Sequence, residues 1–345
     1  MFSHSLRSIT SLSPPTSYSD PPQHRTMGHP SLIFGAASIG MDFSTQESVQ
    51  DALKVLKELN ISQIDTAGRY PPTNHGRSEE LLGEVGAASQ GFSISTKILA
   101  TQLGYGSGEL EASAIKKSLD TSFKRLGVDQ VDILYCHQPD PTAPLKEQAA
   151  ALNDYFKRGS FKRLGVSNFP PKLLQEFIQV CEENDFVKPS AYQGDYNLIT
   201  RGMEKELLPI LRAHSMSFFA FRALAAGFLT GNYSAGKSNG TRFSDDHPLG
   251  KAFQTLYGAP KLQEAMKDLE NALAPLGISG REASLRWIYH HSKLGDGDGI
   301  ILGASKMSQI RENVKSISAG PLSEEVVQKI EGIWDLLAED RGGIL

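Results

Sequence analysis

Four side chains that can move protons stand at or just beyond the ends of three strand-like segments. Asp65 lies near the end of one segment and Tyr70 follows it, Lys97 ends the next, and His137 ends the third. Taken singly, Asp65 could cap a helix, Lys97 could be a surface residue and His137 a core histidine. Together they bring a carboxylate, a phenol, an amine and an imidazole to consecutive strand ends, so we interpret them as catalytic residues.

These four side chains suit the delivery of a proton to an oxygen atom. A tyrosine hydroxyl has a reference pKa of about 10, and a nearby ammonium stabilises the phenolate and lowers that pKa. A carboxylate keeps the ammonium charged and in position, and an imidazole can hold a substrate oxygen by a hydrogen bond. The set supplies no metal ligands and no obvious nucleophile. Reduction of a carbonyl would need hydride from a cofactor, because no side chain provides electrons.

Alternating apolar segments predict the scaffold that positions these residues. Eight strand-like segments alternate with helical patterns, and they span 31–35, 63–67, 92–97, 131–137, 161–168, 190–193, 216–224 and 299–305. Their apolar runs are continuous, which is typical of parallel strands buried on both faces. Eight such units in about 315 residues fit an α/β fold of the (β/α)8 TIM barrel type. A doubly wound open sheet is the alternative, but GAASIG (35–40) and LGYGSGEL (103–110) do not complete its glycine fingerprint.

Helix signals fill the intervals between the strands. Thr45 offers N-cap chemistry to a helix over 45–59, and Ser78 is expected to cap the helix that follows the second strand. A polar insertion over about 231–260 interrupts the alternation. In a barrel the loops that follow the strands share one face, so the polar residues at strand ends should meet there. Besides the first four, they are Ser167, Asn168, Gln193, Arg222 and Ser305.

Composition limits the partners and the compartment. The 345 residues are 39% hydrophobic with a formal net charge of −4, so no basic excess points to nucleic acid. No apolar run approaches the roughly 20 residues of a membrane span. The two cysteines, Cys136 and Cys181, cannot form a disulfide framework, and a reducing, cytoplasmic location is expected.

The first 27 residues differ from the rest of the chain. They are rich in serine and proline, carry Asp20 as their one acid, and lack the apolar core of a secretory signal. We expect residues 1–27 to be a disordered tail, or an upstream start with Met27 as the working one, although Arg7 and Arg25 among the serines faintly resemble a transit peptide. Residues 28–345 are expected to form a single barrel domain.

From about residue 30 to near its C-terminus the chain resembles the aldo-keto reductases, and most closely their aflatoxin-aldehyde reductase branch. The resemblance rests on motifs in the correct order: IDTAGRY (64–70), GRSEELLG (76–83), STK (95–97), SLDTSFKRLGVDQVDILYCHQPD (118–140), LGVSNF (164–169), YQGDYNLITR (192–201), ALAAGFLTG (223–231), LRWIYHHSKLGDGDGIILGAS (285–305) and QIRENV (309–314). It implies a (β/α)8 barrel that reduces a small-molecule carbonyl substrate with NADPH. Relatives are often dimers, so a homodimer is an open expectation.

The resemblance assigns a role to each site residue. Tyr70 would be the general acid, Asp65 and Lys97 would tune it, and His137 would orient the substrate carbonyl. Ser167, Asn168 and Gln193 match the positions that hold the nicotinamide carboxamide, with Phe221 stacked on the ring. The remaining positions implied to bind cofactor are Leu224, Gly227, Leu229, Arg242, Ser305, Lys306, Gln309 and Asn313, where Lys306 would favour NADPH over NADH.

Two features depart from the branch. Where it has Asn-Pro-Leu, this chain has Arg222-Ala223-Leu224, and Asn232 replaces a lysine. We hypothesise that Arg222 takes over a contact with the cofactor pyrophosphate, and a solvent-facing arginine is the alternative. Relatives that reduce acid-bearing aldehydes place arginines after the RF motif and at the extreme C-terminus. Here segment 243–258 has Lys251 but no arginine, and Arg341 is set back from the end, so we expect a neutral or weakly polar aldehyde or ketone.

Other interpretations stay open at this stage. Tyr105, in the glycine-rich stretch, could cover the substrate. Potassium-channel β-subunits resemble this fold and keep the four catalytic residues, so an NADPH-binding regulatory protein with little turnover is an alternative function. A lyase or isomerase on a (β/α)8 barrel is a further alternative, although the cofactor-binding set argues against it.

Overall fold

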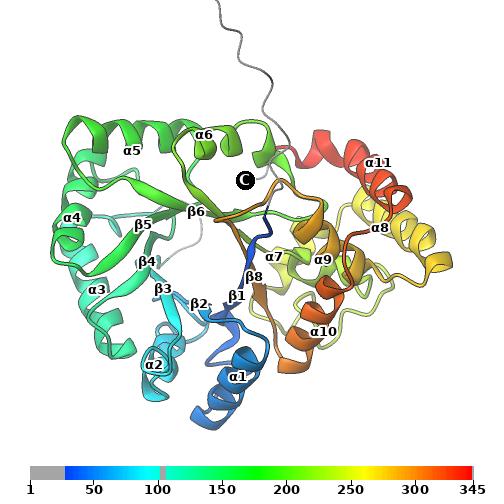
Figure 1. The fold of residues 1–345 in the computed structure, drawn as a ribbon, viewed down its shortest axis with the longest axis horizontal. Helices are drawn as coiled ribbons and strands as arrows, with labels where there is room; N and C mark the ends of the chain where they lie inside the picture. The colour runs from blue at the N-terminus through cyan, green and yellow to red at the C-terminus, as the bar shows by residue number, and fades with distance from the viewer. Residues whose placement is uncertain (1–27, 102–105, 344–345) are drawn as a thin grey trace, which may run out of the picture.

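The computed structural model describes residues 28–101 and 106–343, and within them eight parallel strands close into a barrel surrounded by helices (Figure 1). The predicted tail 1–27 and Tyr105 lie outside the described residues. The strands are β1 (Ser31–Gly35), β2 (Gln63–Asp65), β3 (Ser93–Lys97), β4 (Val131–Cys136), β5 (Phe161–Ser167), β6 (Pro189–Asp195), β7 (Ser217–Phe221) and β8 (Gly299–Gly303).

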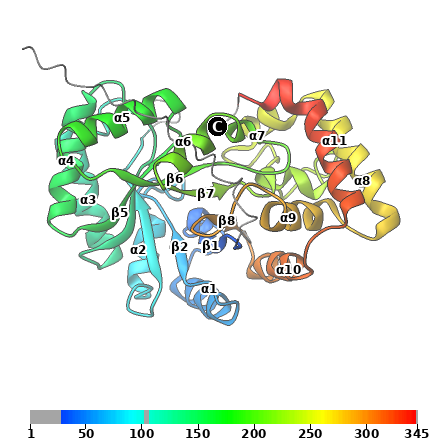
Figure 2. The ribbon, with the colours of Figure 1, turned by 45° about the horizontal axis from the view of Figure 1, so that its top comes forward.

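Pairing between the first and last strands excludes the open-sheet alternative. β1 pairs in parallel with β2 through Gly35 and Asp65, and also with β8 from Ser31 opposite Gly299 onward. Every strand therefore has two neighbours, and the predicted (β/α)8 barrel is confirmed. Figure 2 shows the strands gathered inside a ring of helices.

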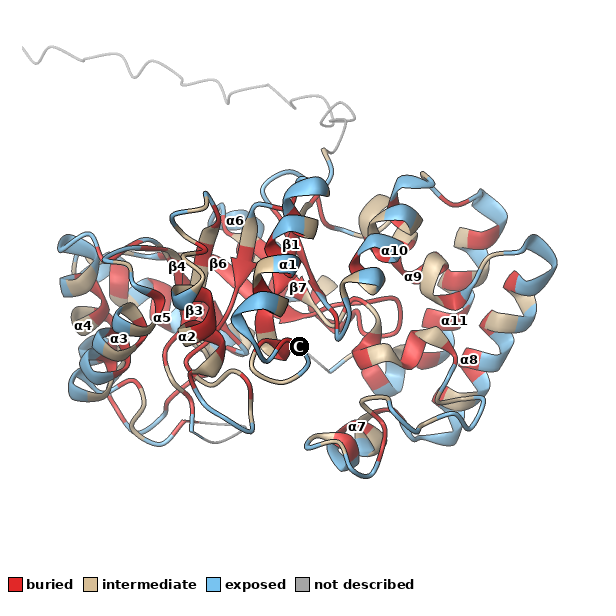
Figure 3. Cartoon of the chain, turned by 90° about the horizontal axis from the view of Figure 1, so that it is seen from below, coloured by how far each residue is buried: buried red, intermediate tan, exposed pale blue. Residues whose placement is uncertain are grey.

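The strands are buried on both faces, as their continuous apolar runs predict. Figure 3 shows buried residues along the strands and on the helix faces. Outward-facing strand residues join the helices in one large core, and a smaller cluster fills the barrel itself. The inner cluster comprises Ile33, Ile133, Tyr135, Ala191, Phe219 and Ile301. Side chains thus fill the lumen, so the chemistry belongs to the loops at the C-terminal ends of the strands.

Helices occupy the intervals between the strands, as the sequence predicts. They are α1 (Gln46–Glu58), α2 (Arg77–Glu84), α3 (Ala112–Leu126), α4 (Leu145–Lys157), α5 (Pro171–Glu183), α6 (Leu207–Ala213), α7 (Gly250–Tyr257), α8 (Pro260–Leu273), α9 (Gly280–His290), α10 (Met307–Ser318) and α11 (Glu324–Arg341). Thr45 caps α1 and exchanges hydrogen bonds with Ser48 in a capping box. No helix among the described residues has both the length and the apolar character to cross a membrane.

The expected role of Ser78 as a helix cap is wrong. The N-cap of α2 is Gly76, whose φ of 87° suits glycine, and Ser78 lies inside the helix. The Ser78 hydroxyl is buried and donates to the Ala36 carbonyl at 3.0 Å, with Thr66 Oγ1 2.9 Å away. Ser78 therefore ties α2 to the ends of β1 and β2.

The polar insertion after β7 folds back over the C-terminal face of the barrel. It contains α7 and an aromatic cluster in which Tyr233 stacks on Phe243 with ring centroids 4.4 Å apart. Phe228 stacks on Tyr257 at 5.4 Å and joins the insertion to the turn after β7. These contacts anchor a segment that sequence periodicity alone did not show to be helical.

Candidate active site

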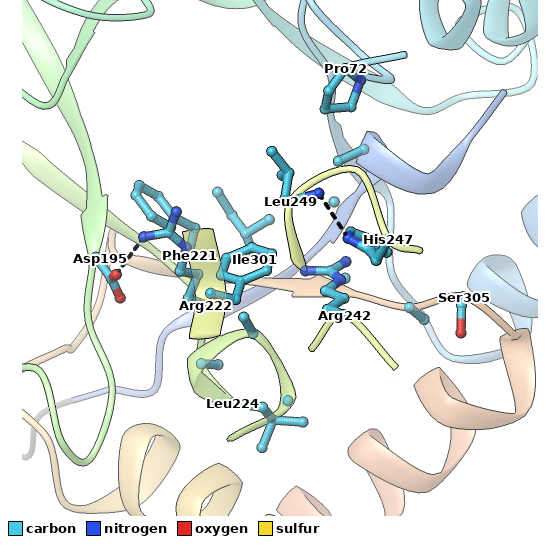
Figure 4. A pocket seen from close by; sticks show the side chains of 18 of the residues that line it. Pro72, Asp195, Phe221, Arg222, Leu224, Arg242, His247, Leu249, Ile301 and Ser305 are labelled. Atoms are coloured by element: carbon cyan, nitrogen blue, oxygen red, sulfur yellow. Dashed lines mark hydrogen bonds and ion pairs between the residues drawn. The ribbon is translucent and has the colours of Figure 1, made fainter. Parts of the chain in front are cut away.

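A cavity of about 1040 Å³ opens at the C-terminal ends of the strands. Asp65, Tyr70 and His137 line it, and the insertion after β7 supplies one wall through residues that include Arg242, His247 and Leu249. Figure 4 shows Leu249 and His247 joined by a hydrogen bond in that wall, opposite Asp195. The barrel therefore places most of the predicted polar strand ends around one space, whereas Lys97 is buried and does not itself line the cavity.

Asp65 and Lys97 form a buried ion pair at the base of the cavity. Lys97 Nζ donates to Asp65 Oδ2 at 2.6 Å and to the Thr66 carbonyl at 2.8 Å. Lys97 is only 1% exposed and Asp65 only 4%. Gln193 Nε2 donates to Asp65 Oδ1 at 2.8 Å, so both carboxylate oxygens have partners. Burial weakens screening by water, and the two charges thus hold each other firmly in place.

Tyr70 lies against this pair and against His137. Lys97 Nζ is 5.0 Å from the centroid of the Tyr70 ring. The rings of Tyr70 and His137 meet edge to face, 5.9 Å apart and 87° from parallel. The Tyr70 carbonyl accepts hydrogen bonds from the backbone N–H groups of Gly76 and Ser78, both at 3.1 Å. The turn into α2 therefore fixes Tyr70 beside the lysine.

His137 is a neutral imidazole at neutral pH. Its pKa falls from the ordinary 6.5 to about 3, because burial disfavours the charged ring and the positive charges of Lys97 and Arg69 add to this effect. Its buried Nδ1 has no hydrogen-bond partner among the described residues. Its carbonyl accepts from Asn168 Nδ2 at 2.9 Å. The ring can thus hold a substrate oxygen by a hydrogen bond, without serving as a charged acid.

His137 should make the fold sensitive to acid. The unfolded chain takes up a proton near pH 6.5 and the folded chain only near pH 3. Protonation therefore favours unfolding, and stability falls as the pH drops through this window. We expect the free energy of unfolding, measured with urea, to fall less between about pH 7 and pH 4 in His137→Gln than in the wild type. The exposed His75→Gln is the control, and parallel pH profiles for wild type and His137→Gln would contradict the expectation.

The residues expected around a nicotinamide ring come together on β5, β6 and β7. Ser167, Asn168, Gln193 and Phe221 all line the cavity. Asn168 has a left-handed backbone with φ of 61°, and its amide donates to Ser167 Oγ at 3.0 Å as well as to the His137 carbonyl. The amide of Asn168 thus links the cofactor side of the cavity to the catalytic side.

The turn after β7 has an unusual backbone conformation, and only some of its side chains line the cavity. Ala226 and Gly227 have φ of 60° and 101° in the 3₁₀ segment η3 (Ala225–Thr230). Leu224 and Gly227 line the cavity, whereas Leu229 is buried beneath the turn and is absent from its lining. Leu229 would therefore act on a cofactor through its backbone or by supporting the turn.

The start of α10 suits a phosphate group. Gln309 Oε1 accepts from the backbone N–H groups of Ser305 at 2.9 Å and Lys306 at 3.3 Å, which leaves its amide nitrogen free to donate. Lys306 is exposed at the N-cap and does not line the cavity, whereas Arg242 does. Asn313 Oδ1 is buried without a hydrogen-bond partner among the described residues. The cations and the helix N-terminus fit a 2′-phosphate, and the orphaned Asn313 oxygen can accept from an amino group of an adenine.

Arg222 does not point toward that end of the cavity. Its Nη1 donates to Asp195 Oδ2 at 2.8 Å, across from β7 to the end of β6. Figure 4 shows Arg222 directed at Asp195, with Arg242 and Ser305 on the other side. The arginine is therefore paired within the cavity wall. A contact between Arg222 and the cofactor pyrophosphate stays a prediction. The orientation of the side chain toward Asp195 does not favour it.

Comparison with known proteins identifies the family of this chain. The family model described as "Aldo/keto reductase family" matches residues 31–335. The chain belongs to the aldo-keto reductase family. Carbonyl reduction by an oxidoreductase is the activity that this membership supports, and the family generally uses nicotinamide cofactors.

Several relatives of this aldo-keto reductase cover nearly the whole chain. "Oxidoreductase sirO" of Leptosphaeria maculans is 35% identical over 90% of this chain and 95% of its own. "Aldo-keto reductase family 7 member A3" of Homo sapiens is 33% identical over 90% and 96%. "Aflatoxin B1 aldehyde reductase member 2" of Mus musculus is 32% identical over 97% and 94%. The resemblance to the aflatoxin-aldehyde reductase branch is confirmed.

Sequence reasoning missed several polar residues of this reductase's cavity, among them Asp42, Arg69, Asp195 and His247. Asp195 was missed because it lies two residues beyond Gln193, where the predicted strand ended, whereas β6 extends to Asp195. Burial raises its pKa, and the Arg222 guanidinium opposes that rise. Arg341, in contrast, is absent from the cavity lining. It is buried, and it donates to the Ile199 carbonyl at 2.8 Å and Thr200 Oγ1 at 2.7 Å.

Proposed function

We propose that this aldo-keto reductase reduces an aldehyde or ketone to an alcohol with NADPH, and that Tyr70 delivers the proton. The observation that carries the proposal is the position of Lys97 Nζ, pinned by Asp65 and Thr66 and 5.0 Å from the Tyr70 ring centroid. An ammonium held there favours loss of the phenolic proton as the substrate oxygen gains charge. When bound, NADPH supplies the hydride that the side chains lack.

Each side chain has a distinct task in this proposal. Neutral His137 holds the carbonyl oxygen by a hydrogen bond and so orients it toward Tyr70. The Tyr70 hydroxyl would transfer its proton to that oxygen, and solvent would restore the proton afterwards. Asp65 and Gln193 keep the lysine side chain in position throughout. Because His137 stays uncharged, the proton is assigned to Tyr70.

The cavity supports NADPH as the cofactor. Phe221 offers a ring face to the nicotinamide, and the amides of Asn168 and Gln193 suit its carboxamide. At the other end Lys306 and Arg242 supply positive charge for a 2′-phosphate, which NADH lacks. The cytoplasmic location and the homodimer remain predictions from composition and resemblance.

A panel assay tests the proposed reaction. Purified protein is mixed with NADPH and a set of aldehydes and ketones, and loss of absorbance at the nicotinamide band is followed. We expect turnover with several aldehydes. Tight NADPH binding with negligible turnover on every substrate would overturn the reductase proposal and favour the regulatory, channel β-subunit-like alternative.

Lys306 should set the preference for NADPH. We expect Lys306→Ala to raise the Kd for NADPH by about tenfold at low salt, because a charge-assisted contact with phosphate is lost. The Kd for NADH should not change. The matched control is Lys315→Ala, an exposed lysine at the opposite end of α10. Equal Kd values for NADPH in wild type and Lys306→Ala, measured by fluorescence quenching, would contradict the assignment.

A further inference from the structure

Arg222 and Asp195 form an ion pair in the wall of the cavity. The Asp195 side chain is 2% exposed and that of Arg222 is 36% exposed, so the carboxylate is enclosed while the guanidinium still meets the open space. Asp195 Oδ1 also accepts from Asn197 Nδ2 at 3.0 Å. Both carboxylate oxygens are therefore occupied by protein, and Asp195 acts as a fixed anchor for the arginine.

The guanidinium lies beside the place expected for the nicotinamide. Its Cζ is 5.2 Å from the centroid of the Phe221 ring and 5.7 Å from that of Phe253 in α7. Asp195 is the direct register partner of Phe221 across β6 and β7. Arg222 thus lies on the β6 side of the cavity. Figure 4 shows Arg242 and Ser305 on the opposite side. This orientation favours contact with the substrate over contact with the pyrophosphate.

Donors remain on Arg222 after it has paired. Nη1 makes the one side-chain hydrogen bond that Arg222 has among the described residues, so its other N–H groups are free to donate. The positive charge is already balanced by Asp195. An uncharged acceptor can use the free N–H groups, whereas a carboxylate would also meet repulsion from Asp195.

We propose that Arg222, anchored by Asp195, is a specificity-determining residue that binds a second, uncharged acceptor oxygen of the carbonyl substrate. The preferred substrates are then aldehydes or ketones that carry a further carbonyl or ester group, and carboxylate-bearing analogues are disfavoured. This inference rests on the proposed reductase function. It refines the expectation of a neutral substrate, because Asp195 balances the charge of Arg222 and the wall then favours an uncharged substrate group.

Substituted benzaldehydes test the inference. Each carries a methyl ester, an isopropyl group or a carboxylate at the meta or para position, and kcat/KM is measured with NADPH. Arg222→Met should lower the ester-to-isopropyl ratio of kcat/KM about tenfold relative to wild type, through loss of a charged hydrogen-bond donor. Comparing ratios between variants cancels the electronic effects of the substituents. Asp195→Asn should raise the carboxylate-to-ester ratio about tenfold, because the charge of Arg222 is then unbalanced.

Two further variants guard the interpretation. Arg222→Met/Asp195→Asn leaves no unpaired buried charge, and it should show the same ester-to-isopropyl ratio as Arg222→Met. Arg212→Met is the matched control, since Arg212 pairs with Asp298 outside the cavity lining, and its ratios should equal those of wild type.

The failures of the two proposals can be told apart. No turnover of any aldehyde by the wild type would defeat the reductase function itself. Turnover with ratios unchanged in all Arg222 and Asp195 variants would overturn the substrate role of Arg222. A Kd for NADPH raised about tenfold in Arg222→Met, with unchanged ratios, would do so too and would assign Arg222 to the pyrophosphate.

Discussion

Replacing Tyr70 with phenylalanine should lower kcat by about three orders of magnitude, which is within the usual contribution of a general acid. The ring and its edge-to-face contact with His137 remain, so the fold and the Kd for NADPH should not change. Stopped-flow absorbance and fluorescence titration measure the two quantities. A kcat within about tenfold of wild type would remove Tyr70 from the chemistry.

A second tyrosine provides a stringent control for Tyr70→Phe. Tyr135 also lies near the same lysine, with Lys97 Nζ 5.7 Å from its ring centroid. It is buried in the barrel lumen and does not line the cavity, and burial raises its pKa well above the ordinary 10. Tyr135→Phe should therefore change kcat little. A loss as large as that in Tyr70→Phe would show that proximity to Lys97, and not access to substrate, explains both effects.

Lys97→Met should remove activity and destabilise the fold by about 3–5 kcal/mol, the usual cost of leaving one partner of a buried ion pair alone. Asp65 is almost fully buried and would lose its closest countercharge. Urea unfolding at neutral pH measures the change in free energy.

The double variant Asp65→Asn/Lys97→Met separates the two causes. It carries no unpaired buried charge, so it should recover part of the lost stability while remaining inactive. A single Lys97→Met variant within about 1 kcal/mol of wild type would contradict the buried pair on which the proposed mechanism depends.

The sequence predicted the barrel because the apolar runs of its strands and the apolar spacing of its helices are both local patterns. Continuous apolar runs mark strands covered on both faces, and the helix predicted over 45–59 is observed as α1, Gln46–Glu58. The catalytic cluster was predictable for the same reason. Asp65, Lys97 and His137 each stand at or beside a strand end, and in a parallel barrel all strand ends meet on one face.

Asp195 shows where local signals stop. The predicted strand ended at Gln193, whereas β6 continues through Asp195 and pairs it with Phe221. The partner of Asp195 is Arg222, 27 residues away and directly after the next strand, β7. Sequence comparison marked Arg222 as unusual, but the direction of its side chain depends on a contact that no local pattern encodes.

The insertion after β7 escaped prediction for a different physical reason. Its order comes from aromatic contacts such as Tyr233 with Phe243 and Phe228 with Tyr257, which join residues well beyond the spacing of one helical turn. Helix α7 has only eight residues, too short to be stable without such contacts. The cavity wall formed by the insertion is therefore the part of the site that depends on tertiary structure.

Transfer of deuterium tests the central claim most directly. The wild-type protein is given an aldehyde in ordinary water with NADPH that carries deuterium in both positions at C4, and the alcohol is analysed by mass spectrometry and NMR. The account predicts one deuterium on the former carbonyl carbon and an exchangeable proton on the oxygen. An alcohol without deuterium on that carbon, or no alcohol while the protein binds NADPH, would contradict it.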